Sequence, residues 1–142
     1  MYKFWIFALI LLLTSCASKQ ISCKYDDDRS FEQFFSRWSV DKAFSLERTK
    51  NPLANFIYIA GNENQKEGEK VKTFHSSTEE LAGYLTLHQY ESKNGLSHKI
   101  KTLTNDRAIV SVFLSDSDWL LDYHFIRLDG CWFLEEVHDY ST

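Results

Sequence analysis

Three apolar runs joined by two turn signals make up the last third of the chain. The runs are residues 108–114, 119–128 and 131–140. The first turn is Ser115–Asp118 and the second is Asp129-Gly130. Asp-Gly between two β-prone runs is a strong hairpin signal, because both residues of such a turn must adopt positive φ. The pattern therefore predicts an antiparallel meander on which the earlier part of the chain packs.

The second turn also predicts which residues face one another across the last hairpin. A two-residue turn pairs Phe125 with Leu134, Tyr123 with Glu136, and Leu121 with His138. Side chains alternate between the two faces of a strand, so one face should be apolar and covered by helices. Its expected members are Val110, Val112, Leu114, Trp119, Leu121, Tyr123, Phe125, Trp132 and Leu134, with Glu136 and His138 towards its end. The other, outer face is mixed, because it carries Ser111, Asp122, His124 and Glu135.

A helix is predicted after residue 30. Phe31, Phe34, Phe35 and Trp38 recur at i, i+3, i+4 and i+7, which gives one apolar stripe that Ser30 can cap. A second short helix is expected at 40–48. Strands follow at 53–60, 70–75 and 99–103. A capping box at Ser77–Glu80 predicts one more helix, with an inner stripe reaching His88 and a loop at 89–95. This order of elements predicts an α+β fold.

The N-terminus matches a lipoprotein signal. The apolar run Phe4–Leu13 is too short to span a bilayer, which takes roughly 20 residues, and it fits the central region of a secretory signal. Leu13-Thr14-Ser15-Cys16 resembles the bacterial lipobox, which implies cleavage before Cys16 and acylation of that cysteine, palmitate included. The alternative is an ordinary secreted protein. We expect a signal peptide at 1–15, a lipidated tether at 16–29 and one α+β domain at 30–142.

The expected location is the cell envelope, where acyl chains hold the protein on a membrane. Ala17 follows Cys16, and it is not the aspartate that retains lipoproteins in the inner membrane of some bacteria. The expectation is therefore a lipid anchor in the outer membrane, facing the periplasm. The formal net charge of −4 becomes −5 when Lys3 is removed with the signal, and no cluster of Lys and Arg stands out. A basic patch is the usual footprint of nucleic-acid binding, so no nucleic-acid partner is expected.

Two cysteines remain once Cys16 carries lipid. An even pair in an exported chain, here Cys23 and Cys131, indicates a disulfide that would pin the tether to the sheet. The alternative is two free thiols.

Several motifs resemble a family of bacterial lipoproteins of unknown function. The quoted residues are Phe31-x-x-Phe34-Phe35, Asp41-x-x-Phe44, Arg48, Pro52-Leu53, Asp129 through Leu134 and Asp139-Tyr140-Ser141. The element order likewise resembles the nuclear-transport-factor-like, or cystatin-like, fold. The resemblance implies a curved antiparallel sheet wrapped around the N-terminal helices, often with a conical pocket. It implies no catalytic residues.

That fold places any site in the cup between the first helix and the closing strands. The expected pocket residues are Trp38, Trp119, Tyr123, Glu136 and His138, with Phe35 and Tyr84 as further walls. Burial among apolar groups would raise the pKa of Glu136, so that Glu136 and His138 could transfer protons as in an isomerase or dehydratase. The alternative is that the strand end leaves the core and both side chains reach solvent.

The outer face allows a second interpretation, a Ser-His-acid hydrolase site. The expected register pairs Ser111 with Asp122 and His124 with Glu135. A serine on a flat strand has neither a strained turn nor an oxyanion hole, so cross-strand polar pairing explains these residues better. The five histidines show no metal-ligand spacing and no glycine-rich phosphate loop is present, so neither a metal nor a cofactor is expected.

These observations favour non-catalytic binding of a small apolar ligand or a partner protein. Two alternatives stay open. One is an enzyme that uses Glu136 and His138, and the other is an accessory or inhibitor protein that acts through the outer sheet face.

Overall fold

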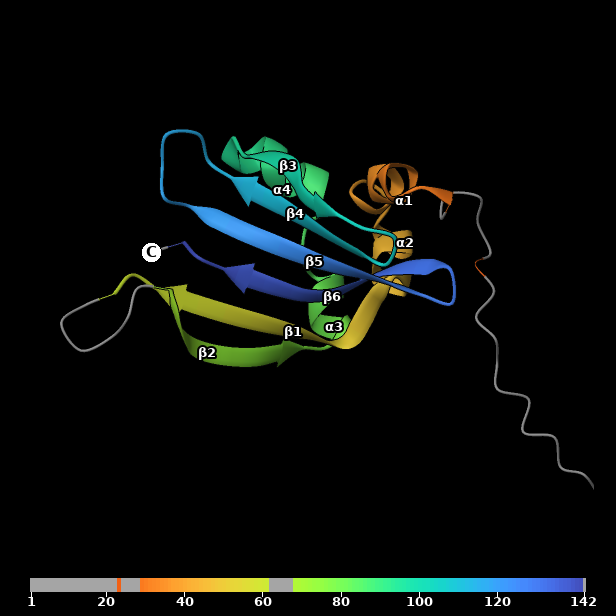
Figure 1. The fold of residues 1–142 in the computed structure, drawn as a ribbon, viewed down its shortest axis with the longest axis horizontal. Coiled ribbons are helices and arrows are strands. Elements are labelled where there is room, and N and C mark those ends of the chain that lie inside the picture. Colours follow the sequence, from red (N-terminus) through yellow and green to blue (C-terminus); the bar gives the residue numbers. More distant parts are fainter. Residues whose placement is uncertain (1–22, 24–28, 62–67, 142) are drawn as a thin grey trace, which may run out of the picture.

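The computed structural model describes residues 23, 29–61 and 68–141 (Figure 1). The predicted signal peptide, the lipidation site Cys16 and most of the predicted tether lie outside these residues. The elements are α1 (Phe31–Trp38), α2 (Lys42–Glu47), β1 (Thr49–Ile59), β2 (Glu69–Ser76), α3 (Thr78–Ala82), α4 (Leu87–Asn94), β3 (Ser97–Leu103), β4 (Arg107–Phe113), β5 (Leu120–Leu128) and β6 (Cys131–Asp139). None of the helices in the described part of the chain is long and apolar enough to cross a membrane.

The strands form one curved sheet in the order β2-β1-β6-β5-β4-β3. Its inner face is the one that the helices cover, and Figure 1 shows α2 and α3 behind the sheet. The predicted α+β architecture is therefore confirmed. One pairing was not predicted: β1 runs parallel to β6, while the other four neighbouring pairs are antiparallel.

Helix α1 forms as its sequence pattern predicts. Ser30 caps it by accepting a hydrogen bond from the backbone N–H of Gln33, and all four residues of the aromatic stripe are buried. Phe31, Phe34 and Trp38 contact Phe125 at centroid distances of 5.3, 5.8 and 5.1 Å. The stripe therefore forms the centre of the core against the inner face of β5.

The helix expected after Ser77 is two helices in the structure. The Ser77–Glu80 capping box is present, but α3 ends at Ala82, with Gly83 as its C-cap. A second capping box, Thr86 with Gln89, starts α4 in the segment where a loop was expected. The loop prediction for 89–95 was wrong, because this second cap restarts the helix after a break.

The last hairpin begins in the predicted register and then departs from it. Asp129 and Gly130 adopt positive φ, and Phe125 faces Leu134 as expected. Between Phe125 and His124 the register shifts by one residue, because Glu135 is an extra residue on β6. Such a β-bulge moves every later side chain of the bulged strand to the opposite face.

The bulge corrects the predicted partners of the end of β6. Tyr123 faces Val137, His124 faces Glu136, and Asp122 faces His138. The predicted pairs Tyr123–Glu136, Leu121–His138 and His124–Glu135 were therefore wrong. The β4–β5 register, with Val110 opposite Tyr123 and Val112 opposite Leu121, is confirmed.

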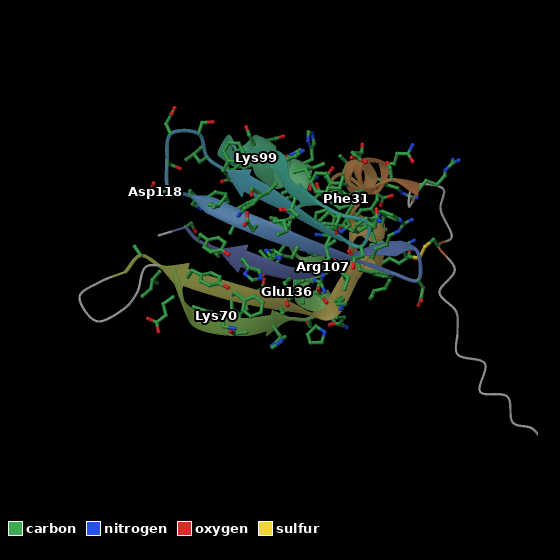
Figure 2. The ribbon with its side chains drawn as sticks, viewed as in Figure 1. Phe31, Lys70, Lys99, Arg107, Asp118 and Glu136 are labelled. Atoms are coloured by element: carbon green, nitrogen blue, oxygen red, sulfur yellow. A yellow bond between two sulfur atoms is a disulfide. The ribbon has the colours of Figure 1, made fainter. Side chains whose placement is uncertain are left out.

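A disulfide joins Cys23 to Cys131, as the pair of cysteines predicted (Figure 2). It links the described residue of the tether to the first position of β6, and the sequence separation is 108 residues. Cys131 is fully buried, so the bond attaches the tether to the core at the β5–β6 turn.

Candidate functional site

A cavity of about 570 Å³ lies on the inner face, between the sheet and the segment from α2 to α4. Volumes of this size are usual for small-molecule sites. Its floor comes from the sheet, and its far wall comes from the helices and the turn between α3 and α4. Its lining includes Trp38, Asn55, Leu81, Tyr84, Leu85, Tyr90, Leu121, Tyr123, Leu134 and Val137. The lining is mainly apolar, as expected for a site that excludes water.

Tyr123 is the main polar group of the floor. Burial raises the pKa of its hydroxyl well above the usual value of 10, and the neighbouring Tyr90, Glu91 and Asp139 act in the same direction. The group therefore stays protonated and can donate a hydrogen bond. No side-chain hydrogen bond engages this hydroxyl among the described residues. A ligand acceptor is the kind of partner that would satisfy it.

Trp38 shows the same feature. Its side chain is 6% exposed, it lines the cavity, and its ring meets the Tyr123 ring edge-on at 6.1 Å. Its indole N–H is buried without a hydrogen-bond partner in the described part of the chain. Buried donors are almost always paired in folded proteins, so an unpaired donor needs an explanation. Trp38 and Tyr123, which both line the cavity, therefore each carry a donor that no described residue engages.

The rim of the cavity is built around Lys42. Its ammonium group donates to the backbone carbonyls of Leu81 (3.0 Å) and Tyr84, which fixes α2 against the end of α3. The next residues, Tyr84 and Leu85, are 62% and 46% exposed although they are large and apolar. The cavity therefore opens beside an exposed apolar lip.

Two of the five predicted pocket residues line the cavity, namely Trp38 and Tyr123. Trp119 lies beside Tyr90, with ring centroids 6.2 Å apart, but it is not part of the lining. Glu136 and His138 project from the outer face because of the bulge at Glu135. The expected cup acid and base are thus on the wrong side of the sheet for a ligand in the cavity.

The sequence also predicted Phe35 and Tyr84 as walls of the pocket. Tyr84 lines the cavity, whereas Phe35 packs in the hydrophobic core. Sequence reasoning missed Asn55, Tyr90 and Val137. Tyr90 lies in the segment 89–95, for which the sequence pattern predicts a loop, and strict alternation along β6 would place Val137 on the outer face. The sequence did hold a signal for Val137, because two adjacent polar residues, Glu135 and Glu136, interrupt the alternation of β6.

The outer-face residues form two separate groups. The first centres on Asp122, which is 1% exposed and accepts from the Ser111 hydroxyl at 2.6 Å and from Lys101 at 2.8 Å. Ser111 thus donates its hydroxyl hydrogen to a carboxylate, and no imidazole engages it in the part of the chain that the structure describes. The group is a satisfied cross-strand network, which is the simpler of the two interpretations drawn from the sequence.

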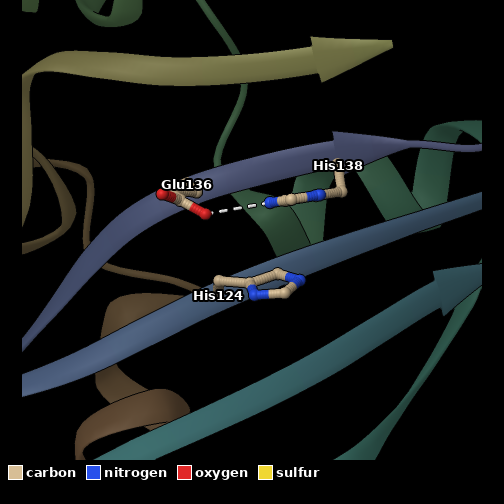
Figure 3. A group of neighbouring side chains, drawn as sticks. All are labelled: His124, Glu136 and His138. Atoms are coloured by element: carbon tan, nitrogen blue, oxygen red, sulfur yellow. Dashed lines mark hydrogen bonds and ion pairs between the residues drawn. The ribbon is translucent and has the colours of Figure 1, made fainter. Parts of the chain in front are cut away.

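The second group is His124, Glu136 and His138, which adjoin one another on β5 and β6 (Figure 3). Burial and the neighbouring His138 lower the pKa of His124, although Asp122 and Glu136 oppose the shift. Glu135, which was expected opposite His124, instead binds Lys50 at 2.6 Å and Arg107 at 3.4 Å.

Comparison with solved structures shows which known fold this chain resembles. No protein-family model matches the sequence, and no curated protein sequence matches it. Among solved structures, an NTF2-like protein from Bacteroides fragilis superposes with a TM-score of 0.56 at 15% identity, over 84% of this chain and 50% of that one. This chain therefore spans about half the length of that protein.

Two other structures are less similar. A DUF4783 family protein from Bacteroides uniformis has a TM-score of 0.42 at 9% identity, over 75% of this chain and 92% of that one. A domain of unknown function with a cystatin-like fold from Nostoc punctiforme has a TM-score of 0.34 at 15% identity, over 78% and 72%. The chain has an α+β fold that is similar to the NTF2-like fold.

Proposed function

We propose that this protein is an envelope lipoprotein whose cavity binds a small, mainly apolar ligand with a hydrogen-bond acceptor. The observation that carries the proposal is the unengaged hydroxyl of Tyr123 at the floor of an apolar cavity. An acceptor on the ligand would take this hydrogen bond, and the apolar walls would supply most of the binding energy. Trp38, which also lines the cavity, carries a buried indole N–H with no hydrogen-bond partner among the described residues.

The lining supports binding rather than catalysis. Among the lining residues none is a histidine, an aspartate or a glutamate, and the charged groups are Lys42 and Lys93. Lys42 is already bound to two backbone carbonyls. General acid–base catalysis most often uses a histidine or a carboxylate within hydrogen-bond reach of the substrate. Glu136 and His138, the candidates from the sequence, project from the other face of the sheet.

Membrane attachment rests on the lipobox that ends at Cys16. An acylated Cys16 would hold the cavity near a bilayer, where apolar ligands concentrate. The direct test replaces Cys16 with Ser and fractionates the cells. The anchored protein should move from the membrane fraction to the soluble fraction, and a variant that stays in the membrane at its mature size argues against lipidation.

The ligand proposal is tested with the uncharged fluorophore N-phenyl-1-naphthylamine and the protein as the cell processes it. Leu121→Trp should abolish the fluorescence rise, because the larger ring fills the floor of the cavity. His124→Ala on the outer face is the matched control on the same strand and should leave binding unchanged. Equal binding by wild type and Leu121→Trp would overturn the proposal.

Tyr123→Phe addresses the hydrogen bond itself. The probe has no strong acceptor, so this variant should bind it normally. Mass spectrometry of apolar molecules that co-purify with the protein should show them depleted in Tyr123→Phe relative to wild type. A co-purified molecule that the wild type converts to product would favour the enzyme alternative. A stoichiometric protein partner that His124→Ala releases would favour the outer-face alternative.

A further inference from the structure

We propose that His124, Glu136 and His138 form a binding site for a divalent transition-metal ion, with Zn²⁺ as the best match. The three donor atoms lie within 4.8 Å of one another on neighbouring strands (Figure 3). The site is on the outer face, so it is separate from the cavity. Sequence spacing did not reveal it, because the ligands come from two strands and meet only through the bulge at Glu135.

His138 is held from both sides. Its Nε2 is 3.0 Å from Glu136 Oε2, and its Nδ1 is 3.0 Å from the Tyr58 hydroxyl. Histidines that bind metals commonly hydrogen-bond through their other ring nitrogen, which fixes the ring and the tautomer. The Glu136 carboxylate can only accept, so Nε2–H donates to it in the metal-free protein. When a metal ion replaces that proton, the ring proton lies on Nδ1, where the Tyr58 hydroxyl can accept it and hold the ring.

His124 would be the third ligand of the metal ion. Its Nε2 is buried and has no hydrogen-bond partner among the described residues. Its ring stacks on His138, with centroids 4.1 Å apart and planes at 24°. An imidazole nitrogen that has no hydrogen-bond partner among the described residues is available as a metal ligand.

The distances require only a local adjustment. Tetrahedral Zn²⁺ with ligands at about 2.0–2.1 Å has donor atoms about 3.4 Å apart. The His138–Glu136 pair, at 3.0 Å, is already close to this spacing. His124 must turn its ring towards that pair, and the turn breaks no hydrogen bond of Nε2, since the structure shows none for it in the described residues.

The donor set selects the kind of ion. Two imidazole nitrogens and one carboxylate oxygen suit Zn²⁺ and its neighbours in the first transition row, whereas Ca²⁺ and Mg²⁺ prefer oxygen ligands. The Glu136 side chain is 35% exposed, so water can complete the coordination. Asp122 nearby is paired with Lys101 and is not free to join the site.

The test uses chelator-stripped protein, as cells process it, titrated with Zn²⁺ by calorimetry and with Co²⁺ by absorption spectroscopy. We expect one ion per chain and a tetrahedral Co²⁺ spectrum. His124→Ala and Glu136→Gln should each weaken binding at least tenfold, and Tyr58→Phe should weaken it about 10- to 100-fold through the orientation of His138.

His98→Ala is the matched control, because His98 Nδ1 is 2.7 Å from Glu91 Oε1 in a second histidine–carboxylate pair away from the cluster. It should bind Zn²⁺ as the wild type does. Glu136→Gln keeps the shape of the side chain, so it reports on the site even if His124→Ala folds poorly. The proposal is overturned if wild type shows no saturable binding of Zn²⁺ or Co²⁺, or if Glu136→Gln binds both ions unchanged.

Discussion

The buried carboxylate of Asp122 gives the sharpest test of the energetics of this fold. Asp122 is 1% exposed and depends on two partners, the hydroxyl of Ser111 at 2.6 Å and the ammonium group of Lys101 at 2.8 Å. We expect the removal of the whole group to cost less than the separate losses of its two partners added together. The reason is that a single deletion leaves a buried charge less well satisfied, whereas joint replacement leaves no charge behind.

The magnitudes follow from the exposure of each partner. Ser111 is buried, so Ser111→Ala removes a hydrogen bond to a charged group and should cost about 1.5–3 kcal/mol. The Lys101 side chain is 51% exposed, so water can replace part of its interaction. Lys101→Met should therefore cost about 1–2 kcal/mol, less than the roughly 3–5 kcal/mol seen when a fully buried pair is broken.

The assay is urea unfolding of the single variants and of the triple variant Ser111→Ala, Lys101→Met, Asp122→Leu. The triple variant should lose less free energy of unfolding than the two single losses added together. Ser36→Ala, at an exposed position of α1, is the control and should change stability by less than about 0.5 kcal/mol. A triple variant that loses the full sum or more would refute the reasoning.

Three further outcomes are expected. Cys23→Ser should lower the free energy of unfolding by about 2–5 kcal/mol, because the disulfide closes a loop with a sequence separation of 108 residues. Reduction of the disulfide in the wild type should cause the same loss of stability. A loss below about 1 kcal/mol would contradict this expectation. Burial raises the pKa of Tyr123, so its stabilising contribution is complete below about pH 10 and is lost as the pH rises. Tyr123→Phe should therefore flatten the alkaline fall in the urea midpoint, and an unchanged fall would count against a buried hydroxyl. Gly95 ends α4 at φ 67°, so Gly95→Ala should cost about 1 kcal/mol in thermal unfolding, and a neutral result would exclude the left-handed cap.

Short-range patterns predicted the parts of the fold that short-range physics decides. The stripe from Phe31 to Trp38 needs only the helical period, and the Asp129-Gly130 turn needs only two residues with positive φ. Both predictions are confirmed. The pairing of Cys23 with Cys131 is confirmed too, and there the count of cysteines left few choices.

The candidate site was harder to predict because it depends on a single extra residue. With strict alternation, Glu136 and His138 point into the core and Val137 points out. The bulge at Glu135 reverses all three and gives the inner face an apolar residue in place of two polar ones. Burial favours the bulged arrangement, since an unpaired polar group in the core would be costly. The parallel pairing of β1 with β6 is a long-range choice that no local pattern encodes.

The disulfide also shortens the chain segment between the lipid anchor and the folded domain in the anchored protein that we propose. Cys23 follows Cys16 by seven residues (23 − 16), a contour of at most about 25 Å, whereas α1 begins fifteen residues after it (31 − 16), at most about 54 Å. The effective concentration of the domain at the membrane surface falls roughly as the −3/2 power of tether length. The shorter segment therefore raises this concentration about threefold. Reduction of this one bond would let the domain range farther from the bilayer without detaching it, which would make its reach responsive to the redox state of the compartment.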